Sequence, residues 1–248
     1  MSGTIPMRRM SMSALVYLAT VSVAGLAALG LALNDIAHAE LGSRVAVWAA
    51  LALLTIVAGR MTVRLPLSRC RVSFSDAVIF LSILAFGPSL STLTGAIDGC
   101  FASRKKASVW YKRVFNTLAL AISVQLSSRL FQAMLPSGAA RGMIGGTLQM
   151  LLPIAGLAAS YFILNTMFVS LAAWLVDGIA PLTIWRMALP WSAPACMAGA
   201  AAAALVFQVV QQAGTASFVT VLPFPLILYF AYRASLRGSL SSNAPHRS

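Results

Sequence analysis

Two of the five acidic residues of this chain, Asp76 and Asp98, lie in a single apolar stretch, SFSDAVIFLSILAFGPSLSTLTGAIDG, residues 73–99. Each lies eleven residues from Gly87, so a fold-back at Gly87-Pro88 would bring the two carboxylates to a similar depth. An unpaired carboxylate in the apolar interior of a membrane costs about 3 kcal/mol even on the most lenient scale. The pair is therefore either held by structural partners or available to bind a ligand or a proton.

A structural role for Asp76 follows from its local sequence. Ser73-x-x-Asp76 opens an apolar run in the manner of a capping box with Asp in place of Glu. A carboxylate in the first turn of a helix is also stabilised by the helix macrodipole. We therefore expect Asp76 to cap its own helix, beside Arg71.

Asp98 stands inside an apolar segment, between Gly95 and Gly99. Two small residues four apart allow a second helix to approach closely. The nearest polar side chains at that depth open the next helix, at Lys112, Arg113 and Asn116. The sequence therefore predicts that Asp98 pairs with Arg113 or Lys112, aided by Asn116.

A second set of polar side chains falls within later apolar segments. Asn165 and Thr166 lie near the expected midplane with Tyr161 one turn away, while Gln125, Arg129 and Gln132 occupy the outer half of the preceding segment. These side chains could line a polar pocket open to the outer face. They could equally form interhelical hydrogen bonds, each contributing about 1 kcal/mol or less. The candidate ligand-binding residues are Asn165, Thr166, Tyr161, Gln125 and Arg129.

Residue types suited to catalysis are sparse. The two histidines, His38 and His246, lie in a loop and in the C-terminal tail, without the partner spacing of a metal site or a nucleophile-base pair. Cys70, Cys100 and Cys196 lack CxxC spacing, and the sequence contains neither HExxH nor a phosphate-binding glycine loop. We expect no catalytic residue, no metal site and no cofactor.

Composition indicates the medium that must hold these residues. The chain has 248 residues, of which 59% are hydrophobic and only 9% charged, too few to cover a soluble globule of this size. A membrane-spanning helix needs about 20 predominantly apolar residues. The sequence predicts an all-α, polytopic transmembrane helical bundle of about eight apolar segments over residues 13–235, with a cytoplasmic segment at 1–12 and a polar cytoplasmic tail at 236–248. The predicted segments are 13–33, 45–59, the two halves of 75–101, 115–135, 152–176, 190–210 and 218–232.

Pro88 divides the segment that contains both acids. Proline removes a helical donor and disfavours helix at the preceding residue, so a helix over residues 75–101 should break at Gly87-Pro88. Each half would be only about 18 to 22 Å long at 1.5 Å per residue, which is short of a full span. We expect two short tilted helices or a re-entrant hairpin, either of which returns the chain to the side from which it came.

The formal charge of +13 is explained by where the basic residues fall. Most of the 18 Lys and Arg residues cluster in short loops on one side of this topology, whereas Arg44 and Arg141 fall in outer loops. This asymmetry follows the positive-inside rule and places both termini in the cytoplasm. Tryptophan placement agrees, with Trp174 expected near the cytoplasmic interface and Trp48 near the outer one. We therefore expect a lipid bilayer rather than nucleic acid as the partner of the basic residues.

The order of several segments resembles a known class of protein. RLPLSRCRVSFSDAVIFLSILAFGPSLS, WYKRVFNTLALAIS, NTMFVSLAAWL, IWRMALPWSAP and VLPFPLILYFAYR follow one another as in the multi-pass membrane sensor domains that precede GGDEF or HD-GYP signalling domains in bacteria. The resemblance covers roughly residues 45–235. It implies a last helix that continues into an output domain, whereas this sequence stops shortly after YRASLR. We therefore expect a stand-alone sensor-like module that acts through a signalling partner in trans.

A second resemblance implies a different function. FSDAVIFLSILAFGPSLSTLTGAIDG is similar to the Ser-Asp and Phe-Gly-Pro signature of the S components of energy-coupling-factor vitamin transporters. Such proteins bind a vitamin toward the outer face and dock on a partner through small residues of the first helix, here Ala24, Ala28 and Ala32. The sequence thus predicts an integral protein of the bacterial inner membrane that binds a small molecule, for sensing or alternatively for uptake, and that is not an enzyme.

Overall fold

The computed structural model describes residues 11–40, 42, 44–60, 62–64, 71–102, 110–135 and 147–214. The chain forms two compact units, residues 1–204 and residues 205–248. Each unit is considered by itself. In the second unit the described residues are 205–214, which comprise the end of one helix and Gly214.

The described residues are mainly helical, which confirms the all-α class. The helices are α1 (Met12–Ala37), α2 (Arg44–Arg60), α3 (Ser75–Phe86), α4 (Pro88–Ala102), α5 (Trp110–Met134), α6 (Thr147–Asp177) and α7 (Pro181–Ala213). Two short strands, β1 (Thr62–Arg64) and β2 (Arg71–Ser73), pair antiparallel between α2 and α3, an element that the sequence analysis did not predict.

Four of these helices are long and apolar enough to cross a membrane, over residues 12–37, 110–134, 149–177 and 189–213. Helices α2 and α3 are apolar but shorter, and α4 has 15 residues. The prediction of about eight spans is therefore too high for the part of the chain described. The eighth predicted segment, residues 218–232, lies outside the described residues, as do most of the basic loops.

The predicted break at Gly87-Pro88 is confirmed. Helix α3 ends at Phe86, Gly87 adopts φ 76° and ψ −165°, and α4 begins at Pro88. This backbone conformation is essentially restricted to glycine, because a Cβ atom would clash with the backbone. Proline suits the first turn of α4, where its missing N–H has no intrahelical acceptor. The two residues together produce the turn between two short helices.

Helix α4 packs closely against α5 through the two glycines that flank Asp98. A Cβ atom added at Gly99 would lie 2.7 Å from the backbone oxygen of Asn116, and one added at Gly95 would lie 2.7 Å from Val124 Cγ2. These distances are well below ordinary van der Waals contact. The expectation that Gly95 and Gly99 allow a close helix approach is confirmed, and α5 is the helix that they admit.

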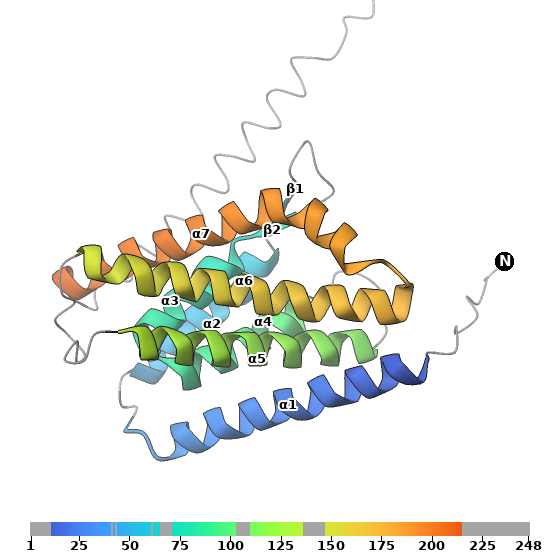
Figure 1. The fold of residues 1–248 in the computed structure, drawn as a ribbon. Coiled ribbons are helices and arrows are strands. Elements are labelled where there is room, and N and C mark those ends of the chain that lie inside the picture. The colour runs from blue at the N-terminus through green and yellow to red at the C-terminus, as the bar shows by residue number, and fades with distance from the viewer. Residues whose placement is uncertain are drawn as a thin grey trace, which may run out of the picture. The chain divides into compact units, whose positions relative to one another are not determined.

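Helix α1 packs on α5 through its own glycine. Val21, Gly25, Ala28 and Ala32 are buried, whereas Ala24 is exposed. A Cβ atom added at Gly25 would lie 2.5 Å from Leu118 Cβ. Ala28 and Ala32 therefore contribute to packing within this chain. Figure 1 shows α1, α5 and α6 side by side in the first unit, with α2, α3 and α4 behind them.

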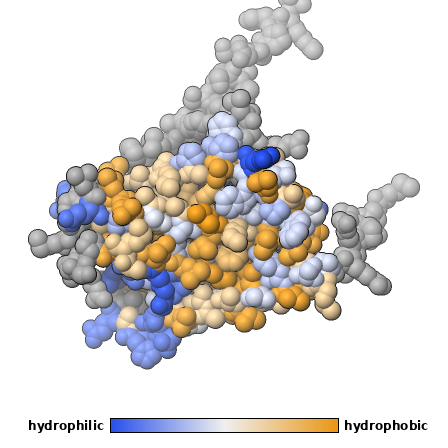
Figure 2. All heavy atoms as spheres, in the orientation of Figure 1, coloured by the Kyte–Doolittle hydropathy of each residue, from blue (hydrophilic) through white to orange (hydrophobic). Residues whose placement is uncertain are grey.

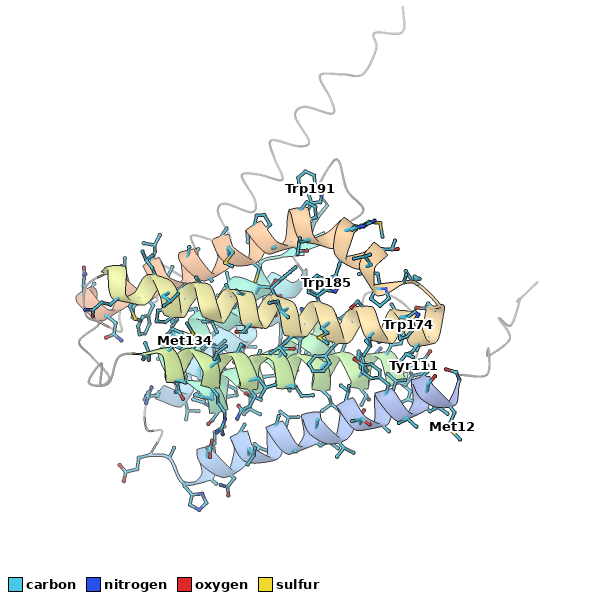
Figure 3. The ribbon with its side chains drawn as sticks, viewed as in Figure 1. Met12, Tyr111, Met134, Trp174, Trp185 and Trp191 are labelled. Atoms are coloured by element: carbon cyan, nitrogen blue, oxygen red, sulfur yellow. The ribbon has the colours of Figure 1, made fainter. Side chains whose placement is uncertain are left out.

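The outer faces of the long helices are apolar. Large hydrophobic side chains are exposed along α1, α6 and α7, among them Leu26 at 61%, Leu152 at 71% and Leu205 at 65%. The face seen in Figure 2 is accordingly covered largely by hydrophobic residues. Figure 3 shows Tyr111 and Trp174 toward the same end of the first unit, where α5 begins and α6 ends, while Met134 lies at the other end of α5.

Candidate functional site

Asp98 is almost completely buried, with 5% of its surface exposed. Its Oδ2 atom accepts a hydrogen bond from Ser75 Oγ at 3.1 Å, which joins the end of the hairpin's second helix to the start of the first. Its Oδ1 atom has no hydrogen-bond partner among the described residues. Oδ1 faces Gly59, near the end of α2, where an added Cβ atom would lie 2.9 Å from it.

Asp76 lies in the first turn of α3 and is partly exposed. Its Oδ1 atom accepts a hydrogen bond of 2.9 Å from the hydroxyl of Tyr161, which is 1% exposed. The Tyr161 ring packs edge-on against Phe80 of α3, with the ring centroids 5.1 Å apart. Helix α6 therefore presents a fixed hydroxyl donor to this carboxylate.

The two carboxylates are close enough to repel one another, as the fold-back predicts. Helix α7 completes their surroundings within the first unit. Its Cys196 lies within electrostatic reach of Asp76 and donates its thiol to the Ala158 carbonyl oxygen at 3.6 Å. Gly199 lies against α3, with its added Cβ 3.6 Å from Ala77 Cβ. Residues of α2, α3, α4, α6 and α7 thus meet around one carboxylate pair.

The predicted ion pair of Asp98 with Arg113 or Lys112 is wrong. Lys112 instead lies 4.0 Å from Asp177, and the buried Nε atom of Arg113 has no hydrogen-bond partner among the described residues. Asn116 meets α4 through its backbone, beside Gly99. Because α4 and α5 touch backbone to backbone here, Asp98 turns toward α2 and α3 and away from the basic start of α5.

The predicted capping box is also wrong, although Asp76 does lie in the first helical turn. The N-cap of α3 is Phe74, and no side chain makes a cap hydrogen bond there. Ser73 pairs with Thr62 in the short ladder, so its backbone is extended one residue before the cap. The side chain of Arg71, the expected neighbour of Asp76, lies outside the described part of the structure.

A second polar group surrounds the turn at Gly87-Pro88. Arg129 Nη2 lies 3.7 Å from Asp35 Oδ2, and Ser89 Oγ donates to the same oxygen at 3.1 Å. With its amide oriented to satisfy both neighbours, Gln125 donates to Thr92 Oγ1 at 2.6 Å and accepts from Arg129 Nε at 3.0 Å. This network links the turn to α1 and α5. Arg129 and Asp35 are each about half exposed, so their pairing contributes little to stability.

The five predicted ligand-binding residues do not share one set of contacts. Gln125 and Arg129 belong to the network at the turn, whereas Tyr161 bonds to Asp76. Asn165 and Thr166 are partly exposed and make no hydrogen bond with other described residues. Sequence reasoning did not include Ser75, Gly59 or Cys196 among the residues around the acids. In the sequence, the glycine near the end of the apolar segment 45–59 was the feature that could have indicated a close contact between this helix and another.

The chemistry of the site is that of two carboxylates, two hydroxyls and a thiol in an apolar setting. Within the described ranges, no group of three or more His, Cys, Asp or Glu residues is placed to hold a metal ion. The site can bind a positively charged ligand or exchange a proton. Comparison with protein-family models, curated proteins and solved structures found no match.

Proposed function

We propose that this protein is a membrane-embedded, sensor-like binding module of the bacterial inner membrane, with both termini cytoplasmic and with its ligand site at Asp76 and Asp98. The observation that carries the proposal is the buried Oδ1 atom of Asp98, which has no partner among the described residues and lies beside a second carboxylate. A stable membrane protein retains such a costly arrangement where it serves function. The proposal includes no catalytic step.

Helix α7 supports a signalling role. It approaches the carboxylate pair through Cys196 and lies against the start of α3 through Gly199, so a rearrangement at the pair alters the surface on which α7 rests. Pro190 and Pro194 interrupt the hydrogen bonding of this helix on the side of its N-terminus. The binding event would reach a partner in trans through α7.

Uptake of a small molecule, as in an S component, is the alternative proposal. Docking on a partner would then use small residues of the first helix. Ala28 and Ala32, however, are buried against the other helices of this chain, which leaves Ala24 as the exposed member of that row. This packing favours sensing over uptake.

Native mass spectrometry of the detergent-purified protein tests for a ligand. We expect the wild type to retain a small molecule, or to change its melting temperature when pH, sodium chloride or putrescine is varied. Asp98→Asn should lose that response. Asp177→Asn is the matched control, because Asp177 is half exposed and pairs with Lys112 away from the site. The proposal is refuted if wild type, Asp98→Asn and Asp76→Asn respond identically to all of these probes.

A further inference from the structure

We propose that the ligand of the Asp76–Asp98 site is a proton, held on Asp98 beside an ionised Asp76. This inference rests on the proposed function, because it uses the same site and names what the site binds. It follows from the different surroundings of the two carboxylates and from the lack of space next to Asp98.

The surroundings of Asp76 oppose its charged form less than those of Asp98 do. The residue lies in the first turn of α3, where the helix macrodipole stabilises a negative charge. Its Oδ1 atom accepts a hydrogen bond from Tyr161 at 2.9 Å, and it is partly exposed. A donor, a helix N-terminus and partial exposure each stabilise a carboxylate relative to a carboxylic acid.

The surroundings of Asp98 favour its neutral form. It is 5% exposed, lies near the C-terminal end of α4, and directs Oδ1 toward Gly59 near the C-terminal end of α2. The C-terminal end of a helix carries partial negative charge, so both helix ends oppose a carboxylate at this position. Ser75 is the one described donor to this side chain, and it bonds to Oδ2.

None of the described charged or titratable groups on the neighbouring helices is a positively charged partner of Asp98. Helix α3 contributes Asp76, α6 contributes Tyr161 and α7 contributes Cys196, all of which are neutral or negative. On α5, Lys112 pairs with Asp177, and Arg113 forms no ion pair with described residues. From α2 the described neighbour is Gly59, and the side chain of Arg60 lies outside the described part of the structure.

Space next to Asp98 selects among cations. A single methyl group at Gly59 would already lie 2.9 Å from Oδ1, closer than ordinary contact between a carbon and an oxygen. An organic ammonium group is larger than a methyl group, so it does not fit between Oδ1 and Gly59 at this separation. A proton adds no such volume, and it therefore fits this arrangement of helices.

Binding is a reversible proton transfer. A hydronium ion donates its proton to the Asp98 carboxylate, forming an O–H bond at Oδ1 and leaving water. The neutral acid then carries a hydrogen-bond donor at Oδ1, which faces Gly59 in the last turn of α2. Loss of the proton removes that donor and places a negative charge against the end of α2, so the packing of α2 on α4 depends on protonation.

Infrared pH-difference spectroscopy of the purified, full-length protein tests the inference. We expect a protonated carboxyl stretching band at neutral pH in the wild type. The band should be absent in Asp98→Asn and retained in Asp76→Asn. The melting temperature of the wild type should fall over the pH range in which that band disappears. The reason is that the folded state binds the proton more tightly than the unfolded state, so folding loses stability when the proton is released. Asp98→Asn, which retains a neutral side chain, should lack this fall.

A measurement on the wild type alone covers the case in which a variant fails to fold. Carbon-13 labelling of the aspartate carboxyl groups should show one protonated aspartate at neutral pH. The inference is overturned if all aspartates are ionised at neutral pH, or if the band persists in Asp98→Asn. If no protonated carboxyl exists but sodium chloride or putrescine still acts through Asp98, the proton is the wrong ligand and the proposed function stands. If no probe acts through Asp98, both fail.

Discussion

Replacing Gly25 by alanine should separate α1 from α5. The added Cβ atom would lie 2.5 Å from Leu118 Cβ and 2.9 Å from both the Cα and the carbonyl oxygen of Leu118. Because Cα and O belong to the backbone of α5, no change of the Leu118 rotamer relieves this overlap. Carbon atoms normally meet at about 3.5 to 4.0 Å, so α1 must withdraw by roughly 1 Å, and such a gap forfeits about a quarter to a half of the dispersion energy between the atoms it separates.

The energetic cost can be bounded from these distances. Overpacking of this kind destabilises by about 1 to 3 kcal/mol, whereas replacing glycine by alanine in a helix recovers about 0.5 to 1 kcal/mol. The net loss is therefore about 0 to 2.5 kcal/mol, which corresponds to a fall in melting temperature of up to about 10 °C for a chain of this size. Tryptophan fluorescence during thermal unfolding in detergent measures that fall.

Gly30 provides a matched control on the same helix. It is exposed, and an added Cβ atom meets nothing within 4 Å, so Gly30→Ala should leave the melting temperature unchanged or raise it slightly. Equal melting temperatures for Gly25→Ala and Gly30→Ala would show that α1 does not pack on α5 at Gly25 and would refute the close approach.

Three further outcomes are expected. Gly87→Ala should lower the melting temperature, because alanine rarely adopts φ 76° with ψ −165° and the strain costs about 1 to 3 kcal/mol of stability. An unchanged melting temperature would contradict the conformation of the turn. Lys112→Ala should change stability by less than about 1 kcal/mol, because Lys112 and Asp177 are each about half exposed at 4.0 Å, and a larger loss in unfolding experiments would show that the pair is shielded from water. Reporter fusions should alternate outside, inside, outside and inside at positions 40, 108, 140 and 240, and a periplasmic signal at 240 would exclude the proposed orientation.

Local steric rules account for the part of the hairpin that could be predicted. Proline and glycine restrict the backbone at their own positions, so Gly87-Pro88 specifies the break whatever surrounds it. Small residues at 95 and 99 likewise indicate a close approach. The helix that packs against these glycines is determined by the whole fold. The sequence alone therefore predicted a close approach at Gly95 and Gly99 without identifying α5 as the neighbour.

The partners of the acids could not be predicted because they depend on which faces meet across the bundle. Arg113 and Ser75 both lie near helix starts at the level expected for Asp98, and charge alone favours arginine. The backbone contact of Gly99 with Asn116 turns Asp98 away from α5 and toward Ser75. The distinction depends on the rotation of α4 about its axis, which no local pattern encodes.

Helix α4 is constrained differently on its two buried faces, and this difference determines what can move when Asp98 changes charge. On the α5 face, Gly99 already meets backbone atoms, so α4 cannot move closer to α5. Ser75 holds the opposite carboxylate oxygen by a single hydrogen bond at 3.1 Å, and Gly59 meets Oδ1 without a side chain. We therefore expect repulsion between a charged Asp98 and the end of α2 to displace α2 or α3 rather than α4. Since Ala77 of α3 lies against Gly199, a displaced α3 would change the surface that α7 contacts.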